Sequence, residues 1–302
     1  MKPASPGTQN GSNQIKPSPM KRRVNELYDE YRSGEVSRRE FMKKLALVTG
    51  GTAAAVVILP GCTGATARAA GRSAMKVTGD FITYPGASGE MRAWISIPEG
   101  NEKYPGVIVI HENRGLVPHI RDVSDRMARE GFVALAPDAL SPLGGTPEDQ
   151  DKGREMIGQL DREETIRNLV AAVKYLETHP RTSGMVGCTG FCWGGAMTNQ
   201  VAVNSPDLDA AVPYYGTTPA PEDVPKIKAK VMAHYAGNDE RINAGIPAFE
   251  EALKKAGIEY QIFIYEGAQH AFNNDTSERY NKEAADLAWK RTTDFFRETL
   301  KG

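Results

Sequence analysis

The most constraining feature of this sequence is the glycine-rich run Gly-Phe-Cys-Trp-Gly-Gly at residues 190–195. It follows the short apolar run 185–188, which fits a buried strand, and it precedes residues 196–203, which suit a helix. A strand-to-helix turn between glycines is the context of the G-x-S-x-G nucleophile elbow, and here Cys192 stands at the nucleophile position. The turn also places the Trp193 N–H at a helix N-terminus, where an oxyanion would form. The alternative is that Cys192 is a small buried residue in a tight turn.

Composition places the chain among ordinary globular proteins. Its 302 residues are 40% hydrophobic and its net charge is −1, which allows a sizeable core and gives no sign of nucleic-acid binding. Positive charge gathers at the N-terminus, because residues 1–44 hold ten Lys or Arg against five Asp or Glu. The three cysteines, Cys62, Cys188 and Cys192, are too few for a disulfide framework and form no C-x-x-C pair, so we expect no metal site.

The N-terminal segment has the features of an export signal. Residues 1–36 are polar or charged, and we expect a disordered or partly helical extension. Residues 37–70 then read as a signal segment: Ser-Arg-Arg-Glu-Phe-Met-Lys at 37–43 resembles the twin-arginine export motif, and the uncharged run after it suits the h-region of a signal peptide. We therefore expect an exported protein that uses the export machinery as a partner, which cell fractionation can test.

How the signal segment is processed is left open by the sequence. Leu-Pro-Gly-Cys at 59–62 resembles a lipoprotein box, which would attach a lipid anchor at Cys62. The small residues at 65–69 offer ordinary cleavage sites instead, and an uncleaved segment would leave the protein anchored in the membrane. The expected location is periplasmic, or membrane-anchored and facing outward.

Residues 71–302 alternate between strand and helix patterns and contain no internal repeat. Strands are expected at 80–84, 91–97, 106–110, 132–136, 185–188, 210–215, 231–236 and 260–265, with helices near 120–131, 166–176, 196–203, 244–256 and 278–299. The first two strands are joined by a glycine-containing turn and should pair antiparallel. The alternation that follows predicts a single α/β domain whose mostly parallel, doubly wound sheet has an antiparallel N-terminal edge.

Two polar residues complete a catalytic pattern with Cys192. Asp239 follows the strand that ends at 236, and His270 comes soon after the strand that ends at 265. Residues at the carboxyl ends of parallel strands meet at one edge of the sheet. The chain order of nucleophile, acid and histidine is that of α/β-hydrolases, in which the imidazole moves the nucleophile's proton and the carboxylate holds the imidazole tautomer. Singly, Asp239 fits an ordinary turn and His270 a structural role. Their common order favours a triad.

The pattern as a whole resembles the dienelactone hydrolase family over roughly residues 76–300. The resemblance rests on short motifs at 111–115, 137–138, 190–195, 214–216, 237–239 and 270–272. It implies an α/β-hydrolase fold, no cofactor, and a small-molecule ester or lactone as substrate. In the family a glutamate after the third strand contacts the resting cysteine, and Glu112 matches it as a thiol-tuning residue. The family's oxyanion hole maps to the N–H groups of Asn113 and Trp193. A salt bridge of Glu112 with Arg114 or Arg121 is the alternative.

Two departures from the family bear on the substrate. Members that act on dienelactone carry two arginines that bind its carboxylate. One lies a few residues beyond the Pro-Asp pair and one four residues beyond the histidine, where this chain has Ser141-Pro142 and Asn274. An unpaired carboxylate is costly to bury. We therefore expect neutral esters or lactones to be preferred, unless Arg114, Arg241 or Arg279 supplies the missing charge.

The remaining candidates concern the pocket and the reaction class. Arg114, Tyr214 and Tyr215 are the expected pocket residues, and burial against the sheet is the alternative for the two tyrosines. His111 and His234 could line the pocket wall, but they better fit satisfied core histidines. We interpret the chain as a hydrolase that cleaves an ester or lactone through a cysteine acyl-enzyme. A thioesterase or peptidase with the same triad is one alternative. An exported binding protein with a degenerate site is another, which burst-phase kinetics would separate from the enzymes.

Overall fold

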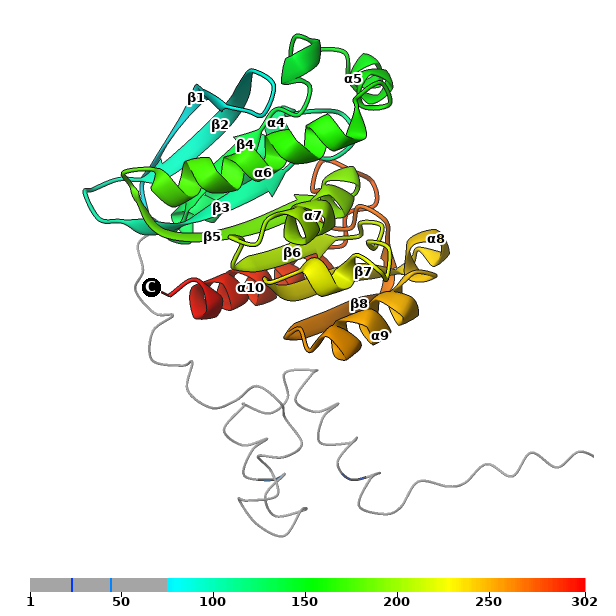
Figure 1. Cartoon of the computed structure of the whole chain (residues 1–302). Coiled ribbons are helices and arrows are strands. Elements are labelled where there is room, and N and C mark those ends of the chain that lie inside the picture. Colours follow the sequence, from blue (N-terminus) through cyan, green and yellow to red (C-terminus); the bar gives the residue numbers. More distant parts are fainter. Residues whose placement is uncertain (1–22, 24–43, 45–74, 302) are drawn as a thin grey trace, which may run out of the picture. The chain divides into compact units, whose positions relative to one another are not determined.

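A computed structural model of the chain describes residues 75–301 together with Arg23 and Lys44 (Figure 1). The chain divides into two units, Met1–Arg72 and Ser73–Gly302, and the second holds the fold. Apart from Arg23 and Lys44, the predicted extension 1–36 and the signal segment 37–70, with Cys62, lie outside the described residues. Export and lipid attachment therefore stay predictions. No helix in the described part of the chain is both long and apolar enough to cross a bilayer.

One mixed sheet of eight strands forms the centre of the described domain, in the order β1-β2-β4-β3-β5-β6-β7-β8. The strands are β1 (Val77–Pro85), β2 (Glu90–Pro98), β3 (Tyr104–Ile110), β4 (Val133–Pro137), β5 (Thr182–Phe191), β6 (Ala210–Tyr214), β7 (Lys230–Asn238) and β8 (Tyr260–Gln269). β2 pairs antiparallel with both β1 and β4, and the other neighbours are parallel. The predicted α/β-hydrolase fold with an antiparallel N-terminal edge is confirmed.

Helices cover both faces of this sheet. They are α4 (Pro118–Arg129), α5 (Gln150–Ile157), α6 (Arg162–Thr178), α7 (Trp193–Asn204), α8 (Glu240–Asn243), α9 (Ile246–Ala256) and α10 (Lys282–Thr299), with short 3-10 turns at Ser141–Leu143 and Val224–Lys226. α6, α7 and α9 pack on one face, and α4 and α10 on the other (Figure 1). β3 shows the reason: Ile108 and Ile110 enter the first layer and Val107 and Val109 the second, all fully buried. A central parallel strand must be apolar on both sides.

Three differences from the predicted elements shape the site. The residue pattern does not predict α5, whose first N–H groups are capped by the Asp149 carboxylate. β8 continues past the expected end at 265 to Gln269, so that His270 stands directly at the end of the strand. α10 begins at Lys282 rather than near 278, because the Asn281 side chain caps it. Residues 270–281 therefore form a turn-rich loop next to the carboxyl ends of the strands.

Two glycines allow the turn between β5 and α7 to lie close to the sheet. A Cβ on Gly194 would lie 2.4 Å from the His111 carbonyl oxygen, and one on Gly190 would lie 2.3 Å from the Gly194 carbonyl oxygen. Side chains do not fit at these distances, so any other residue would push α7 away from β3 and β5. The glycines thus set where the N-terminus of α7 lies.

Candidate active site

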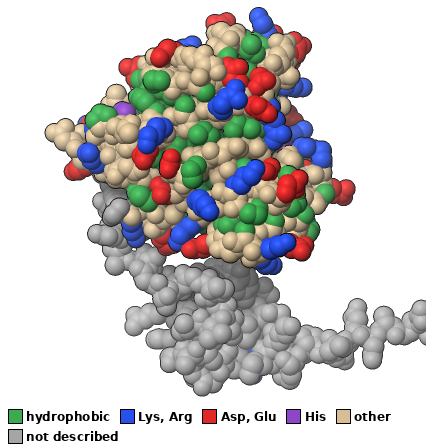
Figure 2. All heavy atoms as spheres, in the orientation of Figure 1, with side chains coloured by type: hydrophobic (Ala, Val, Ile, Leu, Met, Phe, Trp, Pro, Cys, Tyr) green, Lys and Arg blue, Asp and Glu red, His purple; other side chains and the backbone are tan. Residues whose placement is uncertain are grey.

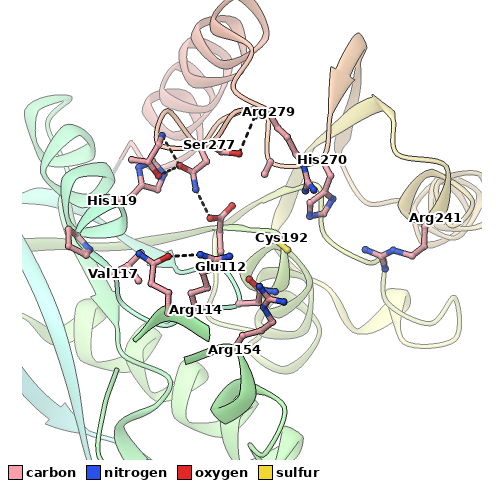
Figure 3. A pocket seen from close by; sticks show the side chains of 16 residues that line it. Glu112, Arg114, Val117, His119, Arg154, Cys192, Arg241, His270, Ser277 and Arg279 are labelled. Atoms are coloured by element: carbon pink, nitrogen blue, oxygen red, sulfur yellow. Dashed lines mark hydrogen bonds between the residues drawn. The ribbon is translucent and has the colours of Figure 1, made fainter. Parts of the chain in front are cut away.

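Cys192 occupies the turn between β5 and α7 with φ of +57° and ψ of −114°. A non-glycine residue rarely adopts such a conformation, and strain of this kind clusters at functional turns. Its N–H donates to the Tyr214 carbonyl and its own carbonyl accepts from the Ala196 N–H, each at 3.1 Å. These bonds hold the turn while the thiol lies against a cavity of about 810 Å³ (Figure 3).

His270 and Asp239 form a bonded pair at the same edge of the sheet. Nδ1 of His270 lies 2.5 Å from Oδ2 of Asp239, and their side chains are 20% and 8% exposed. Asp239 thereby holds the tautomer in which Nδ1 carries the proton, leaving Nε2 to accept one. His270 and Cys192 line one cavity, although no hydrogen bond joins them within residues 75–301. The fold therefore brings all three predicted triad residues to one place.

Glu112 lies in the cavity wall just after β3. Its Oε2 accepts a 2.7 Å hydrogen bond from Nδ2 of Asn274. Burial raises the pKa of Glu112, and the bond from Asn274 opposes this rise. In the described part of the chain it makes no salt bridge with Arg114 or Arg121, so that alternative is wrong. Asn274, which the sequence marks only as a missing arginine, is the residue that orients this carboxylate.

The thiol of Cys192 is held in its protonated form at rest. Burial raises its pKa from 9.0 to about 11, and the nearby Glu112 carboxylate adds to the rise. The Trp193 N–H and the Arg241 guanidinium act in the opposite direction. The thiolate is the nucleophilic form of cysteine. A reaction at Cys192 therefore requires a base that removes the thiol proton once a substrate is bound.

Resting Cys192 is expected to react slowly with iodoacetamide at pH 8. A thiol pKa of about 11 leaves about one thiolate in a thousand, against about one in ten for a pKa of 9. The alkylation rate, followed by peptide mass, should rise with pH up to about 11. Glu112→Gln removes a charge that raises the pKa, so this variant should be alkylated faster below that pH. An unchanged rate would contradict the coupling between Glu112 and the thiol.

The two predicted oxyanion-hole residues lie next to the site, and His111 packs between the segments that carry them. Asn113 lines the cavity next to Glu112, while the Trp193 N–H faces the thiol from the start of α7. The His111 ring stacks on Trp193 at 5.3 Å; its Nδ1 donates to the Glu112 carbonyl and its Nε2 accepts from the Ala139 N–H. Burial lowers the pKa of His111 and keeps it neutral. Its prediction as a satisfied core histidine is confirmed.

Tyr214 and Tyr215 are buried and do not line the cavity, so their prediction as pocket residues is wrong and the alternative, burial against the sheet, holds. Neither lines the cavity, and both are at most 1% exposed. The Tyr214 hydroxyl shares a 2.6 Å hydrogen bond with Thr292, in a buried network that also includes His234. Tyr215 has φ of +38°, and its ring centroid is 5.0 Å from that of His270. It supports the imidazole from behind.

Asp138 of the Pro-Asp pair organises the loops at the mouth of the site. Its Oδ1 accepts from the Thr146 hydroxyl and its Oδ2 from the Thr146 N–H, at 2.7 and 2.8 Å. The same hydroxyl accepts a 2.7 Å bond from the Leu116 N–H. One buried carboxylate thus joins the loop after β4 to the loop after β3, which carries Glu112 and Asn113.

The cavity is lined by four arginines from four different elements. Arg114 follows β3, Arg154 lies on α5, Arg241 lies on α8, and Arg279 precedes α10. Positions 141–142 and 274, where the family has its carboxylate-binding arginines, carry none. Other arginines line the cavity, however, so the absence of those two no longer argues for a neutral substrate. Arg154 is not among the predicted pocket residues, because the residue pattern does not predict the helix α5 that carries it. Among residues 75–301, no three His, Cys, Asp or Glu side chains gather as a metal site.

The fold and the strand-to-helix turn at Cys192 define the class of protein, an α/β-hydrolase. The sequence pattern described as "Dienelactone hydrolase family" matches residues 91–300. A provisionally named carboxymethylenebutenolidase of Saccharolobus solfataricus is 33% identical over 258 residues, which covers 73% of this chain and 98% of that protein. One from Synechocystis sp. is 33% identical over 239 residues, covering 73% and 97%.

A solved structure agrees with these relatives. The crystal structure of a provisionally named dienelactone hydrolase from Klebsiella pneumoniae superposes with a TM-score of 0.67 at 26% identity, and covers 74% of this chain and 99% of that one. The chain belongs to the dienelactone hydrolase family and is a hydrolase of that type.

Proposed function

We propose that this protein hydrolyses an ester or a lactone through a covalent intermediate on Cys192. One observation carries the proposal: a strained turn presents Cys192 to a cavity that His270, already bonded to Asp239, also lines. Nucleophile, base and orienting carboxylate are the parts that acyl transfer needs. The names of the family and of its relatives support a lactone or ester as substrate.

Acylation follows from the positions of these groups. Nε2 of His270 takes the proton of the Cys192 thiol as the sulfur attacks the substrate carbonyl carbon. The negative charge on the carbonyl oxygen is stabilised by the N–H groups of Asn113 and Trp193. Collapse of the tetrahedral intermediate breaks the carbon–oxygen ester bond, and the imidazolium of His270 protonates the leaving alkoxide. Asp239 stabilises the imidazolium throughout.

Deacylation uses the same groups a second time. His270 takes a proton from a water molecule that attacks the thioester, and the carbon–sulfur bond then breaks. The proton returns to the sulfur, so the free acid leaves and the thiol is restored.

The Glu112 carboxylate raises the pKa of the Cys192 thiol. Its role is to keep the cysteine protonated, and so protected from stray electrophiles, until a substrate is present.

The test is the trapping of the acyl-enzyme. The full chain, mixed with 4-nitrophenyl butyrate and quenched within the burst phase, is expected to gain one butyryl group on the peptide that carries Cys192. Mass spectrometry of the digested protein locates the adduct. Turnover with an adduct on another residue, or on none, would contradict the proposal.

Cys188 provides a matched control for this test. It is fully buried four residues before Cys192, its Sγ contacts the Thr198 hydroxyl at 3.7 Å, and burial raises its pKa to about 12. Such a thiol is inert. Cys188→Ala is therefore expected to form the butyryl adduct as the natural protein does.

A further inference from the structure

The cavity carries more positive charge than a neutral ester requires. Apart from Glu112, its permanently charged side chains are the four arginines described above. The whole chain has a net charge of −1. On the face drawn in Figure 2, Lys and Arg side chains are interspersed with Asp and Glu. The excess positive charge is thus a property of the cavity, and it favours a ligand with anionic groups.

The arginines lie on two sides of the thiol. Arg114 follows β3 and Arg241 follows β7, while Cys192 follows β5, which lies between them in the sheet. Figure 3 shows Arg114 and Arg154 on one side of Cys192 and Arg241 on the other, with Arg279 on the His270 side. A substrate whose carbonyl carbon lies at the thiol therefore has guanidinium groups beyond both ends of its scissile bond.

In the described domain, three of these four arginines form no salt bridge. Within residues 75–301, the Arg241 and Arg279 side chains form neither a salt bridge nor a hydrogen bond. Arg114 donates a 2.6 Å bond to Gln150, a neutral partner, and it interacts with the Glu112 carboxylate only through space, without a salt bridge. Arg154 pairs only with Asp151, whose side chain is 79% exposed, and an exposed pair of this kind binds weakly. All four guanidinium groups are available to an anion.

The Arg114 side of the cavity is preorganised by its packing against α5. A Cβ on Gly153 would lie 2.6 Å from the Arg114 carbonyl oxygen, so α5 packs directly on the Arg114 backbone. The bond from Arg114 to Gln150 then ties the side chain to the same helix that carries Arg154. Preorganised cations lose little freedom when they bind an anion.

We propose that the substrate is an ester or lactone with an anionic group on each side of the scissile bond, one bound by Arg114 and Arg154 and the other by Arg241 and Arg279. The inference rests on the proposed function. The planar guanidinium fork binds carboxylate or phosphate oxygens two at a time. A single anionic group would satisfy one pair and leave the other pair of cations uncompensated.

Four aryl esters test this on the full chain: 4-nitrophenyl butyrate, mono-4-nitrophenyl glutarate, 3-carboxy-4-nitrophenyl butyrate, and mono-(3-carboxy-4-nitrophenyl) glutarate. They carry no carboxylate, one on the acyl side, one on the leaving group, or both. Each carboxylate is expected to raise kcat/KM about tenfold, and both together about a hundredfold. The gain should shrink at high salt. A phosphonate in place of the acyl-side carboxylate shows which of the two anions binds better.

Variants assign each gain to its arginines. Arg241→Gln should lower the preference for one carboxylate and keep the preference for the other, and Arg114→Gln should do the reverse. Arg129, exposed at the end of α4, does not line the cavity. Arg129→Gln is the matched control and should leave every ratio unchanged.

The possible results separate the inference from the function on which it rests. Equal kcat/KM for all four esters overturns the inference and leaves the proposed function standing. A full gain from one carboxylate, with nothing added by the second, also overturns it, because it shows a one-sided anion site. Hydrolysis of none of the esters overturns the proposed function and the inference together.

Discussion

Cys192→Ala is expected to abolish ester hydrolysis, with kcat falling by a factor of about 10⁴ or more. The variant removes the sulfur that forms the covalent bond in the proposed mechanism and leaves His270 with no thiol to deprotonate. The positive φ at this position is already adopted by a residue with a Cβ, so alanine adds no new strain. The fold should persist, and circular dichroism with a thermal unfolding curve checks that it does. Hydrolysis at the natural rate would refute the mechanism.

Cys192→Ser sharpens this result because it keeps a nucleophilic atom. A hydroxyl is much harder to deprotonate than a thiol, and this cavity already raises the pKa of the group at its turn. We expect a steep loss in Cys192→Ser as well. If Cys192→Ser hydrolysed esters as fast as the natural protein, the site would not depend on thiol chemistry.

Asp239→Asn is the second variant with a large expected effect, a loss of about 10⁴ in kcat. The carboxylate of Asp239 accepts a 2.5 Å hydrogen bond from the Nδ1–H of His270. An asparagine at that distance can present its amide N–H and favour the other tautomer, in which Nε2 carries the proton and cannot act as a base. It also removes the charge that stabilises the imidazolium. Steady-state kinetics at several pH values measures both consequences.

The neighbouring residue provides the control for Asp239. Glu240 is exposed at the start of α8, and within residues 75–301 it forms no hydrogen bond or salt bridge with His270. Glu240→Gln should therefore change kcat little. If Asp239→Asn reduced kcat less than tenfold while Glu240→Gln reduced it strongly, Glu240 would be the partner of the imidazole.

Patterns of short range were enough to predict the sheet. Most strands of the domain are short apolar runs between turn residues, so all eight could be placed, and the elbow could be recognised from its glycines. Asp239 and His270 could be predicted as neighbours of Cys192 because the carboxyl ends of parallel strands meet at one edge. Contiguous motifs and regular geometry carry this information along the chain.

The pocket depended on contacts that no local pattern contains. Arg154 lines the cavity only because α5 packs on the Arg114 backbone, and α5 depends on a cap at Asp149 within a polar stretch. Asn274 meets Glu112 across 162 positions of sequence. Local chemistry along the chain thus determined the fold class and the candidate reacting groups. Side-chain directions in long loops follow from packing between distant segments, so only the tertiary structure decided which charges face the substrate and that Tyr214 and Tyr215 do not.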